Sequence, residues 1–404
     1  MMSALRLALP IEARSKSSSR TKDRDELAEM IKEDAKPWLD LRGRFGTTWP
    51  RARASIALDL RVSSNRKQSP RIDKICKWLL DELGGPNSDA IVFKDDKQVK
   101  LLFAIKSVYG PPEKIEVAPD DPWAPGLRGM AELPEPKPTI HLVAQRLSLT
   151  LDGVRRARSL DPPWDPKKVH DSPFGPRDFE TELDEDYLRE LHPDFGGFQQ
   201  EEWDRVTAKL AFTRQMGHIK ALDHLSALAI TELATDKHGL YEWLIPPMRS
   251  NPYAFDLGPI PEAAGDTERF KRRITELMTE RVHAYPHLFP LRPIVGVTVL
   301  YFESGQGKDL DNLVRSLVPE VIRHFQPPDE DQFFWSADSK IAERLRTGQA
   351  SPTNEIRFIE AVALTQRPPS VAPGTAFLLI SDGWRQRSWW ESALDYEEKY
   401  DPDY

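Results

Sequence analysis

Stretches in which apolar and polar residues alternate are separated by helical patterns in the first third of the chain. Four strands are predicted there, at residues 5–9, 54–62, 99–108 and 139–144. Two amphipathic helices are predicted, one around Leu27, Met30 and Ile31 and one over residues 72–83, which Gly84 and Gly85 end. Strands mixed with helices in this order predict an α/β (α+β) fold in which helices lie on a mixed sheet.

The same order of elements recurs toward the C-terminus. Strands are predicted at residues 241–245, 294–302, 356–364 and 376–380. Helices are predicted over residues 310–325 and in the stretch that carries Phe270, Ile274, Met278 and Val282. This recurrence predicts an internal repeat, with copy one at residues 1–152 and copy two at residues 239–383.

Two further segments complete the predicted organisation. Residues 153–238 combine a Pro-rich acidic linker with a long amphipathic stretch, which we interpret as a helical bridge, with an interaction surface as the alternative. Residues 384–404 form a tail rich in acidic and aromatic residues. The tail either docks on a protein partner or on the chain's own basic groove, or forms a terminal helix packed through Trp389 and Leu394.

Composition narrows the class of protein. A chain of 404 residues with 39% hydrophobic residues is long enough for at least two domains. No stretch reaches the roughly 20 apolar residues of a membrane span, so we expect a soluble cytoplasmic protein without a membrane partner. Cys76 is the single cysteine, which excludes a disulfide framework and a Cys-rich zinc site.

The net charge of -8 argues against a protein that coats DNA through its overall charge, but positive charge is concentrated locally. Two basic loops, within residues 14–24 and 61–74, are predicted to contact the phosphate backbone of DNA, with a solvated face as the alternative. The candidate DNA-binding residues are Arg14, Lys16, Arg20, Arg61, Arg66, Lys67, Arg71, Lys74 and Lys308.

Two groups of carboxylates lie at positions suited to a metal ion. Asp309 and Asp311 precede and open the predicted helix 310–325, where two carboxylates can converge on one hard divalent cation. Helix capping is the alternative reading of both. Asp95 and Asp96 precede the predicted strand 99–108, and their alternative reading is a polar turn.

The arrangement Asp-X-Asp-Asn at a helix start, a basic residue four positions after the second Asp, and an Asp-Asp pair before a strand resembles the RusA family of Holliday-junction resolvases. The resemblance extends over both copies. It implies two RusA-like mixed-sheet domains, joined by a helical linker, that form an internal pseudo-dimer and can act as a monomer. It also implies Mg²⁺, or Mn²⁺, as cofactor and branched DNA as partner and substrate.

In copy one the resemblance is partial. Arg71 stands where the family has its first Asp, whereas Asp73 and Lys77 match the second Asp and the basic residue. Asp95 and Asp96 match the acidic pair. The resemblance therefore implies a distorted metal site of Asp73, Asp95 and Asp96, with Lys77 as a catalytic residue.

In copy two the helix-start acids are kept and the acidic pair is lost. Asp309 and Asp311 are implied as metal-binding and catalytic residues, and Arg315 replaces the lysine as the contact to the scissile phosphate. Glu355 is the candidate third carboxylate. The reserve candidates are Asp331 and Asp338.

These residues support two hypotheses. The first is a Mg²⁺-dependent endonuclease that nicks branched DNA such as Holliday junctions. The alternative is a non-catalytic branched-DNA-binding protein, or complex subunit, derived from a resolvase.

Overall fold

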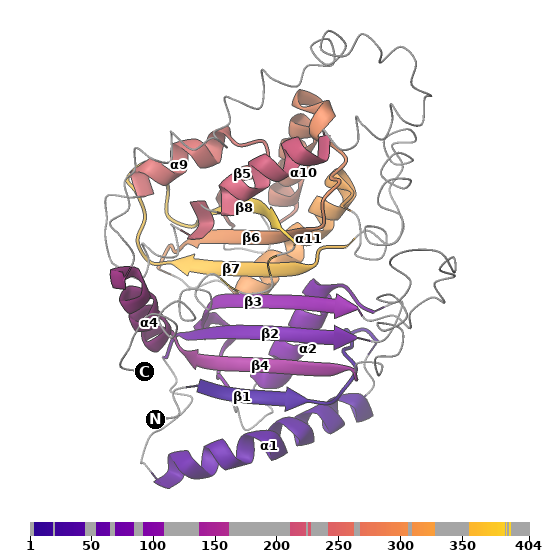
Figure 1. Ribbon diagram of the computed structural model, residues 1–404, viewed down its shortest axis with the longest axis vertical. Coiled ribbons are helices and arrows are strands. Elements are labelled where there is room, and N and C mark those ends of the chain that lie inside the picture. Colours follow the sequence, from indigo (N-terminus) through magenta and orange to yellow (C-terminus); the bar gives the residue numbers. More distant parts are fainter. Residues whose placement is uncertain are drawn as a thin grey trace, which may run out of the picture.

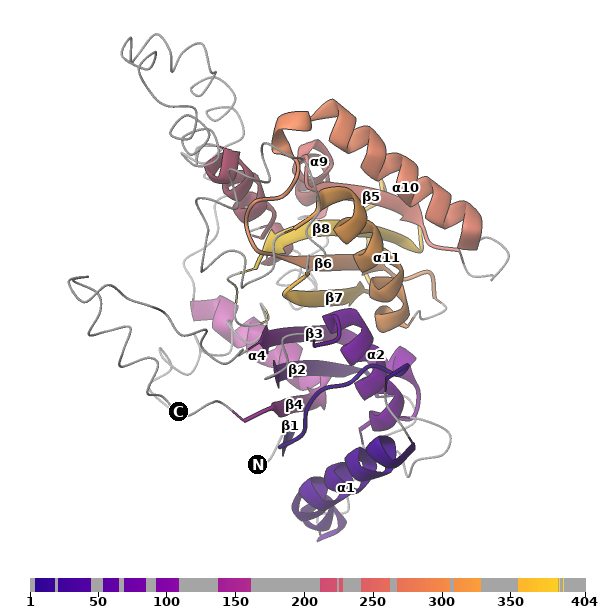
Figure 2. The ribbon, with the colours of Figure 1, turned by 90° about the vertical axis from the view of Figure 1, so that its right-hand side faces the viewer.

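A computed structural model gives the fold (Figure 1). It describes residues 4–18, 21–44, 54–64, 69–84, 92–108, 137–160, 211–223, 225–227, 241–261, 267–305, 309–327, 355–383, 385 and 388. These residues form one eight-stranded mixed sheet with helices packed on it, which confirms the mixed α/β class. Figure 2 shows α1, α2, α10 and α11 along one face of the sheet and α4 on the other.

The N-terminal half comprises the described residues up to 160. Its strands are β1 (Ala4–Leu9), β2 (Ile56–Ser64), β3 (Val99–Val108) and β4 (Thr139–Arg146). Its helices are α1 (Thr21–Arg44), α2 (Ile72–Leu83), the short 3₁₀ helix η1 (Asp96–Gln98) and α4 (Leu147–Leu160). α2 buries the apolar stripe that contains Ile75, Leu79 and Leu83, as its helical spacing predicts.

The C-terminal half begins with α9 (Tyr241–Ser250). Its strands are β5 (Ala254–Pro259), β6 (Val295–Phe302), β7 (Phe358–Leu364) and β8 (Thr375–Asp382). Its other helices are α10 (Thr267–Ala284), η4 (Pro286–Leu288) and α11 (Leu310–Phe325). The strand predicted at residues 241–245 was wrong, because Ile245 and Met248 are buried at the three-residue spacing of a helix face.

The strand order is β1-β4-β2-β3-β7-β6-β8-β5. In the N-terminal half, β4 pairs antiparallel with both β1 and β2, and β2 pairs parallel with β3. In the C-terminal half, β8 pairs antiparallel with both β5 and β6, and β6 pairs parallel with β7. β3 and β7 join the halves as an antiparallel pair, with Phe103 opposite Glu360. The two halves therefore have the same topology, in the arrangement that a two-fold relation between β3 and β7 produces.

The hydrophobic core is continuous across this join. Buried side chains of both halves belong to one cluster. At the join, the rings of Phe103 and Phe358 lie with their centroids 5.5 Å apart. The two halves thus share one sheet and one core, whereas the repeat led us to expect two domains joined by a linker.

The segment predicted as a helical bridge is described only in part. Residues 211–223 and 225–227 are helical, and Ile219, Leu222 and Leu225 are buried. Residues 153–160, predicted as the start of the linker, belong to α4, which therefore extends past the predicted end of copy one at residue 152. The rest of the linker, the rest of the bridge and all of the tail except Arg385 and Ser388 lie outside the described residues. Among the helices that the structure describes, none has both the length and the apolar character needed to cross a bilayer.

Candidate active site

The topology brings acids of the two halves to one edge of the sheet. β3 and β7 are antiparallel, so the start of β3 lies at the edge where β7 ends. β6 is parallel to β7, and α11 starts just after β6, so α11 also begins at this edge. Asp96, immediately before β3, and Asp311, in the first turn of α11, are therefore neighbours although they come from different halves.

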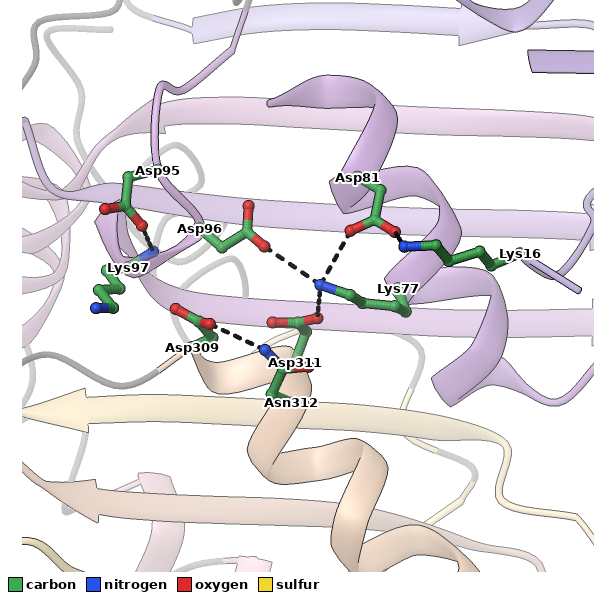
Figure 3. A network of polar contacts seen from close by, with 9 residues as sticks. All are labelled: Lys16, Lys77, Asp81, Asp95, Asp96, Lys97, Asp309, Asp311 and Asn312. Carbon is green, nitrogen blue, oxygen red and sulfur yellow. Dashed lines mark hydrogen bonds and ion pairs between the residues drawn. The ribbon is translucent and has the colours of Figure 1, made fainter. Parts of the chain in front are cut away.

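Lys77 of α2 lies at the centre of this cluster (Figure 3). Its Nζ is 3.1 Å from Asp311 Oδ2 and 3.3 Å from Asp96 Oδ2. It is also 3.0 Å from Oδ1 of Asp81, one turn further along α2. α2 and α11 pack against each other, which places the lysine of one half among the carboxylates of the other. We call Lys77, Asp96, Asp309 and Asp311 the composite site.

Three carboxylate oxygens of the composite site are buried without a hydrogen-bond partner. They are Asp309 Oδ1 and both oxygens of Asp311, of which Oδ2 is ion-paired with Lys77. The other oxygen of Asp309 accepts a hydrogen bond from Asn312 Nδ2 at 2.9 Å. Asp309 is the N-cap residue of α11, but its side chain makes no capping hydrogen bond. A buried oxygen without a partner is costly, and a cation or a water molecule in contact with these atoms would relieve that cost.

Burial and crowding shift the pKa values in the site. Burial raises the pKa of Asp96 to about 6. The positive charge of Lys77 acts to lower this pKa, and the negative charges of Asp311 and Asp309 act to raise it. Burial also raises the pKa of Asp311, against the attraction of Lys77. Burial would lower the pKa of Lys77, but the carboxylates of Asp311 and Asp81 hold it well above its ordinary value. Lys77 is therefore a stable cation at neutral pH.

The composite site fits a hard divalent cation in its donor chemistry. Carboxylate oxygens are the ligands that Mg²⁺ prefers, and Asp309 and Asp311 each offer one that is otherwise unsatisfied. Within the described residues, however, no group of three or more His, Cys, Asp or Glu side chains is arranged as a metal site. The Lys77 ammonium stands at the point toward which Asp96 and Asp311 converge.

Asp95 is oriented differently from Asp96. Its Oδ1 accepts a hydrogen bond from the backbone N–H of Lys97 at 3.0 Å, and it forms a capping box with Gln98 at η1. Asp95 is exposed and carries out the turn-stabilising role that was its alternative reading. Only the second member of the acidic pair contacts Lys77.

The remaining predicted metal ligands lie at the opposite edge. Asp73, in the first turn of α2, is buried and paired with Arg71, whose Nη2 is 3.1 Å from Asp73 Oδ2. Glu355, just before β7, is paired with Lys106 Nζ at 2.5 Å. Lys106 also donates to the backbone oxygen of Pro70, next to the start of α2. We call Arg71, Asp73, Lys106 and Glu355 the paired-ion site.

The structure thus does not bring together the groups that we expected within each copy. Asp73 is separated from Asp95 and Asp96 because α2 begins where β2 ends, whereas β3 begins at the other edge. Glu355 is separated from Asp309 and Asp311 for the same reason. Arg315 is exposed on α11 and forms no ion pair with the described residues, so Lys77 takes the place expected for it.

The predicted DNA-binding residues that are described are mostly paired with acids. Arg14 lies 3.4 Å from Asp23, Lys16 lies 2.7 Å from Asp81, and Arg61 lies 3.3 Å from Asp59. Lys74 is exposed. Arg20, Arg66, Lys67, Lys308, Asp331 and Asp338 lie outside the described residues.

Sequence reasoning missed Asp81, and it missed the contact of Lys77 with the second half. The i, i+4 spacing of Lys77 and Asp81 was a visible signal for their pairing, whereas the contact across the halves depends on the pairing of β3 with β7. No protein-family model, no curated protein and no solved structure matches this chain.

Proposed function

We propose that the protein is a Mg²⁺-dependent endonuclease for branched DNA, built from two diverged RusA-like domains in one chain. In this proposal residues 1–152 and 239–383 are the two copies, and the chain has one cutting centre. The observation that supports it is the convergence of Asp96 from copy one with Asp309 and Asp311 from copy two around Lys77.

The pattern of lost and kept residues agrees with a single centre. Copy one lacks the first helix-start acid, and copy two lacks the acidic pair. In the composite site, Lys77 and Asp96 from copy one lie beside the helix-start acids of copy two, whereas Asp73, which copy one also keeps, lies in the paired-ion site. The replaced positions, Arg71 and Glu355, fall together in the paired-ion site, where each is neutralised by an opposite charge.

The charges of the composite site determine its chemistry. A divalent cation held by Asp309 and Asp311 would act as a Lewis acid toward a phosphodiester. Lys77 keeps its positive charge at neutral pH and can bind a non-bridging phosphate oxygen, which stabilises the extra negative charge of the transition state. Asp96 and Asp81 hold the Lys77 ammonium in place.

One centre in a pseudo-symmetric protein predicts a nick rather than two symmetric cuts. A four-way junction presents two equivalent strands, and the two copies offer two equivalent positions. Among the residues that the structure describes, Asp309 and Asp311 both carry unsatisfied carboxylate oxygens. At the equivalent positions of copy one, Arg71 replaces the first acid and only Asp73 keeps such an oxygen, Oδ1. The paired-ion site would contact the second strand without cutting it.

The test is cleavage of a synthetic four-way junction, labelled on each strand in turn, with Mg²⁺ or Mn²⁺. We expect one nick per junction, lost in Asp311→Asn while junction binding is retained. Asp73→Asn is the matched control, because Asp73 is the equivalent α2 position, and it should still cut. Two coordinated cuts at one junction, or full activity in Asp311→Asn, would contradict the proposal.

A second candidate function is a branched-DNA-binding protein without catalysis. It is favoured by the position of Lys77 Nζ, which lies between the carboxylates of Asp96 and Asp311. There the ammonium group can neutralise these acids in place of a metal ion. The same cleavage assay, run beside a binding assay, separates the two. Junction binding without cleavage in either metal would favour the non-catalytic function.

A further inference from the structure

Lys77 has three acidic partners, and one of them differs from the others in position. Asp311 and Asp96 belong to the composite site, whereas Asp81 lies one turn along α2 from Lys77. Figure 3 shows Asp81 on the side of Lys77 that is away from Asp309. The ammonium group therefore lies between the carboxylates expected to bind a cation and one further carboxylate outside that group.

A lysine in this position competes with a divalent cation. Both would be attracted by Asp311 and Asp96, and they repel each other at short range. If Lys77 had no other partner, a bound divalent cation would either be excluded or push the lysine out of the site. Asp81 offers an alternative partner only one helical turn away, so the lysine can give up Asp311 without leaving the site.

Lys16 holds Asp81 in the orientation that this role requires. Lys16 Nζ is 2.7 Å from Asp81 Oδ2, which leaves Oδ1 directed at Lys77. Burial would raise the pKa of Asp81, but the two lysines lower it below its ordinary value. Asp81 is thus a permanently charged partner for Lys77 near neutral pH.

The other half lacks an equivalent of this acid. Aligning Asp73 with Asp311 places Lys77 opposite Arg315 and Asp81 opposite Pro319. Arg315 is exposed on α11 and does not enter a carboxylate cluster, so it has no need of such a partner. The acid is present only in the half whose basic residue lies in the composite site.

We propose that Asp81 is a positioning residue that retains the Lys77 ammonium beside the composite site when a divalent cation occupies Asp309 and Asp311. The inference rests on the proposed function, because it requires a cation at those two acids. It adds a division of labour: Asp309 and Asp311 bind the cation, while Asp81 prevents the lysine from competing with it.

The experiment measures Mn²⁺ binding to the full-length protein without DNA, by the electron paramagnetic resonance signal of free Mn²⁺. We expect Asp81→Asn to weaken Mn²⁺ binding by about tenfold, because Lys77 then stays on Asp96 and Asp311. Asp81→Glu, which keeps the charge, should bind as the wild type does. Glu82→Gln removes one neighbouring negative charge of α2, paired with Arg24 and not with Lys77, and should change the affinity by less than about twofold.

A double-mutant cycle separates the positioning role from a simple charge effect. In Lys77→Met, Mn²⁺ should bind more tightly than in the wild type, and adding Asp81→Asn should then have little effect. The inference is overturned if Asp81→Asn weakens binding equally with and without Lys77, or no more than Glu82→Gln does. If neither the wild type nor Lys77→Met binds Mn²⁺, the proposed function fails and the inference fails with it. If Mn²⁺ binding and cleavage are normal but the cycle shows no coupling between Lys77 and Asp81, the inference is refuted and the proposed function stands.

Discussion

Lys77 Nζ and Asp311 Oδ2 lie 3.1 Å apart although the two residues belong to opposite halves of the chain. Each stands on the helix that follows the second strand of its half in the common topology, α2 or α11. This contact links the helix of one half to the acids of the other. The two halves are therefore coupled through the composite site as well as through the shared sheet.

Lys77 and Arg315 occupy equivalent helix positions but differ in environment, so their substitution should have different effects. Lys77→Met is expected to lower the single-turnover nicking rate by about a hundredfold or more, because the site loses its fixed positive charge. Arg315→Met is expected to lower it by less than about threefold, since Arg315 is exposed. Nicking rates on a four-way junction measure both. Equal losses in the two variants would contradict the assignment of Lys77.

The paired-ion site should gain metal binding when its first cation is replaced. Arg71→Asp restores an acid at the helix start beside Asp73, whose side chain is fully buried. Two carboxylates without Arg71 repel each other, so we expect the variant to be less stable without metal and to bind one more Mn²⁺ than the wild type. Titration with Mn²⁺ gives the stoichiometry. Arg71→Ala is the control and should gain no site; an unchanged stoichiometry in Arg71→Asp would refute the prediction.

The join between β3 and β7 should make the two halves unfold together. Phe103 is fully buried and contacts Phe358 across the join. Phe103→Ala is expected to lower the free energy of unfolding by about 3 to 5 kcal/mol, the usual cost of removing a buried aromatic ring. Urea denaturation followed by circular dichroism and by tryptophan fluorescence should show one coincident transition. Two separate transitions in the wild type would show that the halves are independent.

Asp223 should make stability depend on pH. Its carboxylate accepts a hydrogen bond from the backbone N–H of Asp382 at 2.8 Å, and burial raises its pKa from 3.8 to about 6, against the attraction of Arg385. A carboxyl group with a higher pKa in the folded chain binds its proton more tightly there. The stability contribution of Asp223 is therefore full below about pH 4 and is lost as the pH rises through about 6.

Asp223→Asn removes this titration. The difference in unfolding free energy between variant and wild type should shift in favour of the variant by about 2 to 3 kcal/mol from pH 4 to pH 7.5. Urea denaturation of both proteins at the two pH values measures it. A difference that does not change with pH would show that Asp223 has the same pKa in the folded and unfolded chains.

Several elements could be predicted from local pattern alone. The helices Ile72–Leu83 and Leu310–Phe325 and the strand Val99–Val108 have the bounds that their apolar periodicity predicts. The strand predicted at residues 241–245 was wrong, because two consecutive prolines, Pro246 and Pro247, disfavour a helical interpretation of the sequence. In the structure both prolines lie within α9.

The composite site could be predicted only in its parts. Asp96, Asp309, Asp311 and Lys77 were each identified from the residues around them. Their combination depends on the antiparallel pairing of β3 with β7, which joins segments far apart in the sequence and leaves no local pattern. Without knowledge of that pairing, the sequence suggests one group of acids within each copy. The structure instead separates Asp73 from Asp96, and Glu355 from Asp311.

The pairing of β3 with β7 also has a consequence for synthesis. β7 begins at Phe358, so the growing polypeptide must add residues 109–357 after β3 before β3 can pair with β7. Until then β3 is an uncovered edge strand, and such edges invite pairing with other chains. We expect ribosome-bound chains that end before residue 358 to be more sensitive to protease, and more prone to associate, than the completed protein. Pulse proteolysis of stalled nascent chains measures this, and equal resistance of short and full-length chains would refute it.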